Sequence, residues 1–267
     1  MHQSDKKLKI ISSFQNEVFK KYLALAQAKK IDGKKASDIF MVEGEREVQR
    51  ALTCGLKLET ILTTDAAAWP NHPVIELAPH LLMKLQVRES IDQAVGVFKR
   101  PQPPLFAKFL QDSSIKLIAL ENCEKPGNLG AVARTAVAFG MTGIVLLGQS
   151  CDPWSANCVR SSVGAIFEIP VFVLEYEEFF ASCKMYHIQT LGAYLNPQSE
   201  SLFMIDLKAK LIFIFGSEDR GLSKKITSQV DKLVMFPMAK SRTADSLNLA
   251  ISTAVFMGEL ARRQYPQ

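Results

Sequence analysis

The sequence predicts an α/β protein in which a smaller N-terminal α/β domain precedes a larger domain built on a mostly parallel sheet. Strand-like and helix-like segments alternate through the second part of the chain, as in folds with helices on both faces of a parallel sheet. The segment 211–215 (LIFIF) is apolar without alternation, which is typical of a central strand covered on both faces. The length of 267 residues suits two domains better than one compact core.

The composition indicates a globular protein. Hydrophobic residues make up 48% of the chain and charged residues 22%, so a sizeable core can form and wholesale disorder is excluded. No apolar run approaches the roughly 20 residues that span a bilayer, and the polar start MHQSDKKLK lacks the apolar region of a secretory signal. We therefore expect no membrane partner and a cytoplasmic location.

Cysteine and histidine usage excludes several kinds of chemistry. The five cysteines are scattered and show no CxxC spacing, which argues against a disulfide framework and against a zinc site. The four histidines form no metal-binding pair and lie outside the glycine-rich segments. We expect no metal and no histidine-based acid–base catalysis.

The opening of the chain is rich in lysine. Nine lysines face only three acidic residues within the first 35 positions, and the net charge of the chain is +5. Such an arm suits a polyanion, because each lysine that neutralises a phosphate releases condensed counterions. A solvated lysine-rich helix face fits the same charge pattern equally well.

The predicted elements of the first domain begin with an amphipathic helix over residues 16–28 (NEVFKKYLALAQA). Its apolar positions are Val18, Tyr22, Leu23 and Leu25. A small α/β pattern follows, in which Gly55 ends the helix. Its elements are a strand over 39–42, a helix over 45–53, a strand over 58–62 and an apolar run over 95–98.

A proline cluster over residues 99–104 (KRPQPP) disfavours both helix and central strand, which makes it the candidate linker. We therefore expect domains over residues 1–104 and 105–267. The second domain is predicted to hold strands over 117–120, 144–147, 171–174, 188–191, 211–215 and 233–236, and helices over 129–139, near Val159 and over 246–262.

The first segment with chemical potential follows the strand that ends near Leu120. Gly127 and Gly130 allow close backbone approach, and Asn128 is predicted as the N-cap of the next helix. Arg134 would then lie in the second turn of that helix. Polar and glycine residues at a strand end occupy the place where open α/β sheets bind ligands.

Two further segments have the same character. Residues 215–223 (FGSEDRGLS) end a strand in Gly216 and place Glu218 in a turn that closes at Gly221. Residues 236–238 (FPM) are followed by a polar stretch and then a helix that Asp245 or Ser246 would cap, with Asn248 in its first turn. Neither GxGxxG nor GxxxxGK[ST] occurs, so dinucleotide redox and phosphoryl-transfer chemistry lose their main support.

Taken together, the three segments resemble the ordered motifs of the SpoU/TrmH RNA methyltransferases. The matching residues are Asn128, Gly130 and Arg134; then Gly216, Ser217, Glu218, Gly221 and Leu222; then Phe236, Pro237 and Met238 with Ser246, Leu247 and Asn248. Residues 160–167 (RSSVGAIF) are similar to the family's intervening Ser-x-Gly-Ala segment. The resemblance covers the chain from about Ile115 to its C-terminus.

The resemblance implies a catalytic domain with a deep trefoil knot, S-adenosylmethionine as cofactor and a homodimer. It assigns Asn128, Arg134, Glu218, Ser246 and Asn248 to the catalytic site. It assigns Gly216, Leu222, Phe236, Met238 and Leu247 to the cofactor. A guanidinium is always protonated, so Arg134 is expected to hold the 3′-phosphate and stabilise charge on the 2′-oxygen, with Glu218 or water accepting the proton.

The expected reaction is methylation of a ribose 2′-hydroxyl in structured RNA, with large-subunit rRNA favoured over tRNA. Residues 10–12 with Asn16, and residues 42–44, resemble a ribosomal-protein-like RNA-binding domain, which favours rRNA. The rivals are a methyltransferase acting on a base nitrogen and a non-catalytic RNA-binding protein of the same fold. The third motif departs from the family by its longer spacer 239–245, from which Lys240 or Arg242 could reach RNA.

Overall fold

The computed structural model describes residues 10–27, 37–86, 93–239 and 246–264. The chain forms two compact units. The first contains the residues up to Pro101 together with Trp154–Arg160, and the second contains Gln102–Pro153 and the chain from Ser161 onward. The domain assignment 1–104 and 105–267 stays a prediction. Within the described ranges, no helix is both long and apolar enough to cross a membrane.

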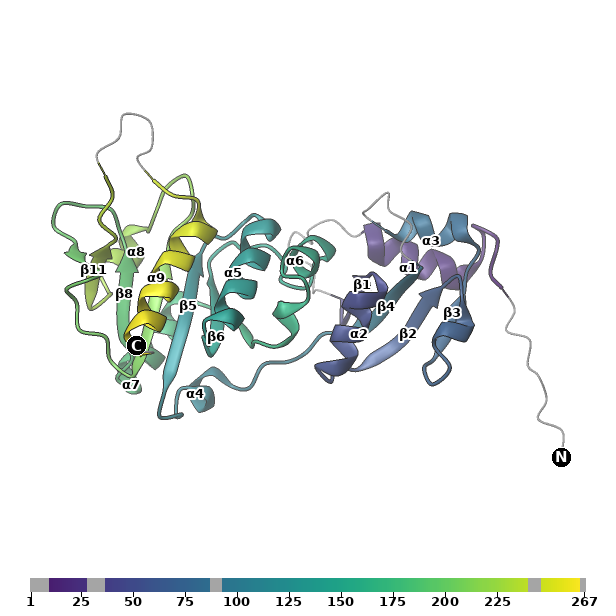
Figure 1. The fold of residues 1–267 in the computed structure, drawn as a ribbon, viewed down its shortest axis with the longest axis horizontal. Helices are drawn as coiled ribbons and strands as arrows, with labels where there is room; N and C mark the ends of the chain where they lie inside the picture. The colour runs from purple at the N-terminus through teal and green to yellow at the C-terminus, as the bar shows by residue number, and fades with distance from the viewer. Residues whose placement is uncertain (1–9, 28–36, 87–92, 240–245, 265–267) are drawn as a thin grey trace. The chain divides into compact units, whose positions relative to one another are not determined.

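The N-terminal unit contains a four-stranded sheet with the order β1-β4-β2-β3. Its strands are β1 (Ile39–Glu43), β2 (Leu58–Thr63), β3 (Val74–Glu76) and β4 (Ala94–Lys99). β4 runs antiparallel to both β1 and β2, and β2 runs parallel to β3. Figure 1 shows this sheet with α1 and α3 beside it.

Helices complete the N-terminal unit. They are α1 (Glu17–Gln27), α2 (Glu45–Thr53), η1 (Ala66–Ala68) and α3 (Pro79–Leu85). α1 and α3 share a core with the sheet through Phe19, Tyr22 and Leu81. The expected apolar face of the first helix was partly wrong, because Phe19 is buried whereas Val18 is 42% exposed. The two positions are adjacent, and only the packing against α3 and the sheet decides which one turns inward.

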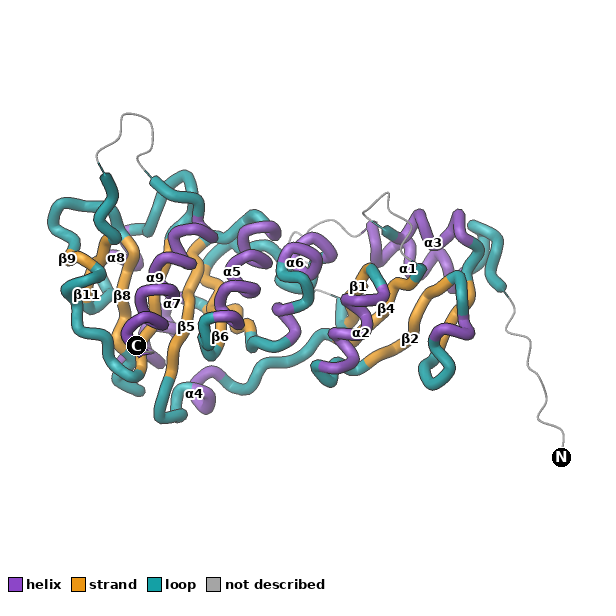
Figure 2. Tube along the Cα trace, viewed as in Figure 1, coloured by secondary structure: helices purple, strands orange, loops and turns teal. Residues whose placement is uncertain are grey.

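The second unit contains a seven-stranded sheet with the order β7-β6-β5-β10-β8-β11-β9, in which every neighbouring pair is parallel. Its strands are β5 (Ile115–Glu121), β6 (Gly143–Leu147), β7 (Val171–Leu174), β8 (Gln189–Ala193), β9 (Glu200–Ser201), β10 (Lys210–Phe215) and β11 (Lys232–Met235). The predicted parallel α/β sheet is confirmed, and the LIFIF segment is its central strand. Figure 2 shows the strands with helices in front of and behind them.

Helices cover both faces of this sheet. Helices α5 (Pro126–Ala138) and α9 (Leu249–Gln264) pack against each other on one face. Phe213 and Phe215 of β10 contact Phe256 of α9, with ring centroids 5.3 and 5.0 Å apart. The alternate residues Ile212 and Ile214 join the core on the other face. That core includes side chains from α4 (Phe106–Phe109), α7 (Tyr176–Met185) and α8 (Lys224–Thr227).

Candidate active site at the ends of the parallel strands

Helix α5 follows β5 directly and carries Asn128 in its first turn. The helix begins at Pro126, which suits the first helical position because proline has no N–H to satisfy and a helix-compatible φ. The predicted start at residue 129 was therefore wrong, and Lys125 rather than Asn128 occupies the N-cap position. The side-chain amide of Asn128 is free to bond elsewhere.

The loop after β10 is a tight turn that requires glycine at two positions. The N–H of Gly221 donates to the carbonyl of Ser217 at 2.9 Å, and Gly221 has a φ of +64°, which favours glycine. A Cβ added to Gly216 would lie 2.0 Å from the carbonyl carbon of Gly221. Any side chain at Gly216 would force the turn open.

Helix α9 begins later than predicted. Its first residue is Leu249, and Asn248 caps it: the N–H of Ala250 donates to Asn248 Oδ1 at 2.9 Å, and that of Ser252 donates to the Asn248 carbonyl at 2.9 Å. The predicted cap at Ser246 is corrected to Asn248, whose carbonyl oxygen caps while its amide nitrogen points elsewhere. The other candidate cap, Asp245, lies outside the described residues, as do Lys240 and Arg242.

Glu218 joins these three segments. Its Oε1 accepts hydrogen bonds from Asn128 Nδ2 at 2.8 Å and from Asn248 Nδ2 at 2.6 Å. Asn248 Nδ2 also lies 3.3 Å from Asn128 Oδ1, and Lys125 forms an ion pair with the other carboxylate oxygen. The structure thus brings together Asn128, Glu218 and Asn248, which come from three distant segments of the chain. We call these three residues and Lys125 the strand-end cluster.

The cluster holds Glu218 in its ionised form. The hydrogen bond from Lys125, and then that from Asn128, lower the pKa of Glu218 below its ordinary value. The carboxylate in turn raises the pKa of Lys125. The side chain of Glu218 is 20% exposed. A carboxylate with a lowered pKa is a weaker proton acceptor, so this geometry favours Glu218 as a fixed acceptor that orients both asparagines.

A second carboxylate, Glu121, ties the end of β5 to the loop after β10. It is 1% exposed and accepts hydrogen bonds from the Tyr176 hydroxyl at 2.9 Å, the Ser223 hydroxyl at 2.6 Å and the Ser223 N–H at 2.8 Å. Burial, together with the bond to Glu121, raises the pKa of Tyr176 to about 12. Our sequence analysis missed both Glu121 and Lys125, whose partners lie far along the chain.

A pocket of about 240 Å³ opens beside the cluster. Six of the ten predicted site residues line it: Gly216, Glu218, Phe236, Met238, Ser246 and Leu247. Much of the remaining wall is apolar and includes Leu195, Val234 and Val255. Leu222 is not on this wall, because its side chain is buried in the core with Ile226.

The side chain of Arg134, another predicted site residue, belongs neither to the pocket wall nor to the strand-end cluster. Because α5 begins at Pro126, Arg134 lies in the third turn of the helix rather than the second. Its side chain is exposed and is not part of the pocket wall. Across the described parts of the chain it makes no hydrogen bond or ion pair, so its guanidinium is available to an anionic ligand.

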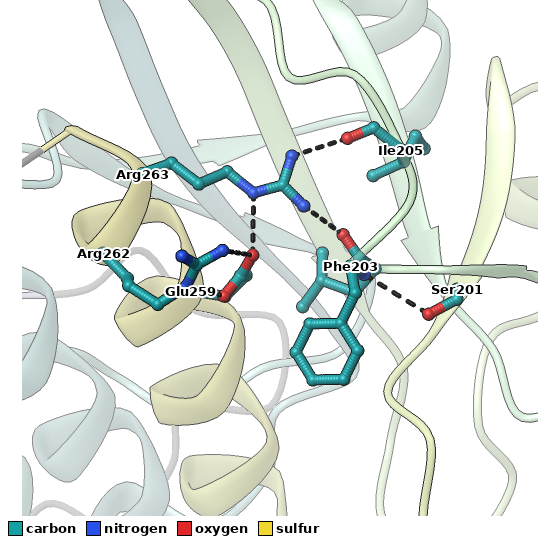
Figure 3. A network of polar contacts seen from close by, with 7 residues as sticks. Ser201, Phe203, Ile205, Glu259, Arg262 and Arg263 are labelled. Carbon is teal, nitrogen blue, oxygen red and sulfur yellow. Dashed lines mark hydrogen bonds and ion pairs between the residues drawn. The ribbon is translucent and has the colours of Figure 1, made fainter. Parts of the chain in front are cut away.

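The far end of α9 forms a network of polar contacts with the segment 201–205 (Figure 3). Arg263 donates to Glu259 at 2.7 Å and to the carbonyls of Ile205 and Leu202, each at 2.6 Å. Phe203 lies between Leu202 and Ile205 in the sequence. Its ring packs edge-on against that of Phe236, with ring centroids 5.1 Å apart. The network therefore fixes the segment that backs an aromatic side chain of the pocket.

Glu259 is the shared acceptor of this network. Its side chain is 5% exposed, and Arg262 donates to it from the solvent side with a side chain that is 70% exposed. Hydrogen bonds from Arg262 and then from Arg263 lower the pKa of Glu259 to about 2. Both arginines thus contact one carboxylate, but Arg263 also reaches the loop behind the pocket.

The described residues contain no group of three histidine, cysteine, aspartate or glutamate side chains that could hold a metal ion. Four of the five cysteines are buried, and Cys54 is half-buried. The site therefore consists of amides, carboxylates, cationic side chains and a largely apolar cavity at the carboxyl ends of parallel strands, where open α/β sheets bind ligands.

Comparison with known proteins assigns the chain to a protein family. The model of the SpoU rRNA Methylase family matches residues 116–258, which contain the whole strand-end cluster. A 23S rRNA (uridine(2479)-2′-O)-methyltransferase of Streptomyces viridochromogenes is 26% identical over 243 residues, covering 84% of this chain and 83% of its own. The 23S rRNA (guanosine(2553)-2′-O)-methyltransferase RlmP of Bacillus subtilis is 25% identical over 266 residues, covering 95% and 99%.

A solved structure resembles nearly the whole chain. The crystal structure of an AdoMet-bound rRNA methyltransferase from Sinorhizobium meliloti has a TM-score of 0.85 and 30% sequence identity, and the match covers 97% of this chain and 99% of that one. The likeness therefore extends beyond the family match into the N-terminal unit.

Proposed function

This chain belongs to the SpoU rRNA methylase family, and we propose that it transfers a methyl group from S-adenosylmethionine to a ribose 2′-hydroxyl of structured RNA. The observation that carries the proposal is the strand-end cluster. Asn128, Glu218 and Asn248 meet through direct hydrogen bonds at the edge of a pocket that Gly216, Phe236 and Leu247 line. A nucleotide and a cofactor can therefore be held side by side.

The pocket suits the proposed cofactor. Its apolar walls match the faces of an adenine ring, and the strand-end loops offer backbone groups to the polar parts of the molecule. We assign those backbone contacts to Gly216, Phe236 and Leu247, with Met238 beside them. S-adenosylmethionine, when bound, supplies an electrophilic methyl group on its sulfonium. The residues around it need only align the ribose oxygen and let its proton leave.

The cluster performs the alignment. Asn128 and Asn248 are fixed by one carboxylate, so each retains a defined orientation before the nucleotide arrives. Ser246 lines the same pocket and would orient the nucleotide with them. Because the pKa of Glu218 is lowered, we assign Glu218 to positioning and the acceptance of the proton to water.

Arg134 is assigned to the RNA backbone. Its exposed side chain lies on the helix whose first turn carries Asn128, and it has no partner among the described residues. A guanidinium recognises phosphate oxygens through two parallel hydrogen bonds. We propose that Arg134 binds the 3′-phosphate of the target nucleotide and stabilises negative charge that grows on the 2′-oxygen.

The proposed substrate is large-subunit rRNA, with tRNA as the alternative. Two relatives that match most of this chain are named as 2′-O-methyltransferases of 23S rRNA. The N-terminal unit is proposed to bind RNA, by its resemblance to ribosomal-protein-like domains. The trefoil knot, the homodimer and the cytoplasmic location stay predictions from the same resemblance.

Substitution of one arginine tests the catalytic proposal. Arg134→Ala should lower methylation about 100-fold or more, because the charge that stabilises the transition state is lost. Cofactor affinity measured by calorimetry should stay within about twofold. Lys184→Ala is the matched control, since it removes an exposed positive charge from α7. Loss of cofactor binding in Arg134→Ala would contradict the assignment.

The substrate proposal has its own test. Positions of 2′-O-methylation are mapped in total RNA from cells with and without this gene. The proposal expects one or a few positions of large-subunit rRNA to lose the modification. A loss confined to tRNA would select the alternative.

A further inference from the structure

A buried carboxylate that the proposed mechanism does not use lies at the end of β5. Glu121 is the last residue of that strand and is 1% exposed. Within the described chain it pairs with no lysine, arginine or histidine, and its hydrogen bonds come from Tyr176 and Ser223. Compared with well-packed apolar groups, a buried carboxylate is a poor source of stability, but it fixes the direction of the donors around it. Its place in the fold therefore indicates a role in fixing geometry.

The hydroxyl of Ser223 bonds to Glu121 rather than to its own helix. Ser223 occupies the N-cap position of α8, but its side chain makes no capping hydrogen bond. A serine at that position commonly accepts a bond from an N–H of the first helical turn. Here the hydroxyl donates to Glu121 Oε1 at 2.6 Å, and the N–H of the same residue donates to Glu121 Oε2 at 2.8 Å. Both carboxylate oxygens therefore hold the end of the loop 216–223.

Glu121 is itself held from a third direction by Tyr176 of α7. The Tyr176 hydroxyl donates to Glu121 Oε1 at 2.9 Å, and Lys225 Nζ lies 4.3 Å from the centroid of the Tyr176 ring. The hydroxyl fits closely under the turn after β6, because a Cβ added to Gly148 would lie 2.6 Å from it. Gly148 has a φ of +66°, which favours glycine. The carboxylate is therefore fixed in place from the side opposite to the loop.

On the β5 side, Glu121 precedes the segment that carries Asn128. The next residue, Asn122, has a φ of +53°, and its Oδ1 accepts a hydrogen bond from the N–H of Gln149 at 2.8 Å. Helix α5 then begins at Pro126. The path of the chain from Glu121 to Asn128 is thus set by local bonds.

On the β10 side, Ser223 ends the loop that carries Glu218. The turn over 217–221 closes on its own backbone hydrogen bond of 2.9 Å, so its internal shape does not depend on Glu121. The start of the loop is fixed by the pairing of β10 with β5, and its end is fixed by the two bonds from Ser223. These bonds set the position of the turn relative to β5, and with it the 2.8 Å contact between Glu218 and Asn128.

We propose that Glu121 is a positioning residue for methyl transfer: by holding Ser223, it places Glu218 so that Asn128 and Asn248 are oriented toward the ribose. The proposal rests on the proposed function, namely transfer to a 2′-hydroxyl. Glu121 does not line the pocket, so it acts through Glu218. Because the turn keeps its own shape, loss of the link should lower the rate of transfer far more than the affinity for the cofactor.

Two substitutions of Glu121 in the full chain test the proposal. Glu121→Met keeps the length of the side chain but removes all three acceptor contacts. Glu121→Gln keeps them, because its carbonyl can accept from the Ser223 N–H while its amide donates to both hydroxyls. With total RNA from cells that lack this gene as substrate, Glu121→Met should lower the rate of transfer at saturating cofactor about 30-fold. Glu121→Gln should restore it to within about threefold of the natural chain. Equal losses in both variants would overturn the proposal.

Ser223→Ala is a milder variant that serves even where Glu121→Met does not fold. It removes one hydroxyl bond and should lower the rate of transfer about 10-fold, with cofactor affinity by calorimetry within about twofold. Thr190→Val is the matched control. The Thr190 hydroxyl likewise donates to a carboxylate, Asp231, at 3.0 Å, but at the amino end of β8. It should lower the melting temperature by a similar few degrees and leave the rate unchanged. A similar loss of rate in Thr190→Val would reduce the effect to stability alone.

A double-mutant cycle shows whether Glu121 acts through the cluster. If Ser223 and Glu121 serve only to place Glu218 against Asn128, then Ser223→Ala should lower the rate less than about twofold further in a chain that already carries Asn128→Ala. A purely structural contribution would retain its full factor in that background, and this result would contradict the proposal.

Failure of this inference can be told apart from failure of the proposed function. Hydrogen exchange of the backbone amides over 216–223 requires no activity. Ser223→Ala should raise it about 10-fold and Thr190→Val should leave it unchanged. Unchanged exchange in Ser223→Ala would overturn the inference whether or not the chain transfers methyl groups. Absence of transfer by the natural chain would overturn the proposed function, whereas full transfer by Ser223→Ala and Glu121→Met would overturn the inference alone.

Discussion

The strand-end cluster and the network of Glu259, Arg262 and Arg263 at the far end of α9 (the Glu259 network) each compensate one carboxylate, but they serve the pocket in different ways. In the cluster, Glu218 bonds to Asn128, Asn248 and Lys125, so its charge is compensated within the protein. In the Glu259 network, the carboxylate bonds to Arg262 and Arg263, and Arg263 also bonds to the carbonyls of Leu202 and Ile205. A compensated cluster is preorganised and holds its geometry before a ligand arrives. The Glu259 network does not line the pocket and acts on it through the contact of Phe203 with Phe236.

This difference predicts how each region responds to substitution. Changes to Asn128, Glu218 or Asn248 should disturb the geometry of the cluster, and therefore methyl transfer, more than they disturb cofactor binding. Changes in the Glu259 network should weaken cofactor binding modestly. The four predictions below test the turn at Gly216, the cluster and the Glu259 network, from the largest effect to the smallest.

Gly216→Ala should have the largest effect. The new Cβ would lie 2.0 Å from the backbone of Gly221, so the turn that lines the pocket must open. We expect cofactor affinity measured by calorimetry to fall about 100-fold, which corresponds to roughly 3 kcal/mol of strain and lost contacts. Gly127→Ala is the control, because a Cβ there meets nothing within 4 Å. Normal cofactor binding by Gly216→Ala would show that the turn is not needed.

Asn248→Asp separates capping from alignment. The aspartate retains an oxygen for the N–H of Ala250, so α9 should remain capped and the melting temperature should change little. Its second oxygen would replace the amide that donates to Glu218 at 2.6 Å, and two carboxylates would repel each other. Methylation should fall about 100-fold. A variant that unfolds would instead mean that the cluster is chiefly structural.

Arg263→Met and Arg262→Met form a matched pair. Both remove a bond to Glu259, but only Arg263 donates to the carbonyls of Leu202 and Ile205. Arg263→Met should weaken cofactor binding about 5- to 10-fold through Phe203 and Phe236, and should lower the melting temperature by several degrees. Arg262→Met removes only bonds to Glu259, from a side chain that is 70% exposed, and should leave cofactor affinity unchanged. Equal effects of the two variants on cofactor affinity would contradict the supporting role.

Lys125→Met should have the smallest effect at neutral pH. Lys125 lowers the pKa of Glu218, so its removal lets that pKa rise toward the ordinary value of 4.5. Glu218 stays ionised at pH 7 in both proteins, and methylation there should change less than about twofold. The stabilising effect of a carboxylate with a depressed pKa is lost as the pH falls through that pKa. The acid limb of the pH–rate profile should therefore move to higher pH. An unchanged limb would show that the ion pair between Lys125 and Glu218 does not set the pKa of Glu218.

The sequence predicted the parallel sheet and the family because those depend on local patterns. LIFIF over 211–215 indicated a covered central strand, and β10 lies at the centre of the sheet. The motif residues Asn128, Glu218 and Asn248 were named from their order along the chain, and the structure brings them together. Their catalytic roles stay proposals.

Other features could not be predicted because distant partners decide them. Asn128 and Ser246 are both good capping residues in isolation, yet α5 begins at Pro126 and α9 is capped by Asn248. Lys125 and Glu121 carry no local signal, since their partners Glu218 and Ser223 lie about 90 to 100 residues away in sequence. Helix α7 was missed because its apolar residues do not follow one clear stripe.

The most direct test of the proposed reaction is the chemical form of the product. Methylation of RNA is carried out with S-adenosylmethionine labelled in its methyl group, and the RNA is then hydrolysed with alkali. A methylated 2′-oxygen cannot attack the adjacent phosphate, so our account predicts that the label is recovered in alkali-resistant dinucleotides. Label recovered in single nucleotides would mean that a base is methylated, and the proposed reaction at the ribose would be wrong.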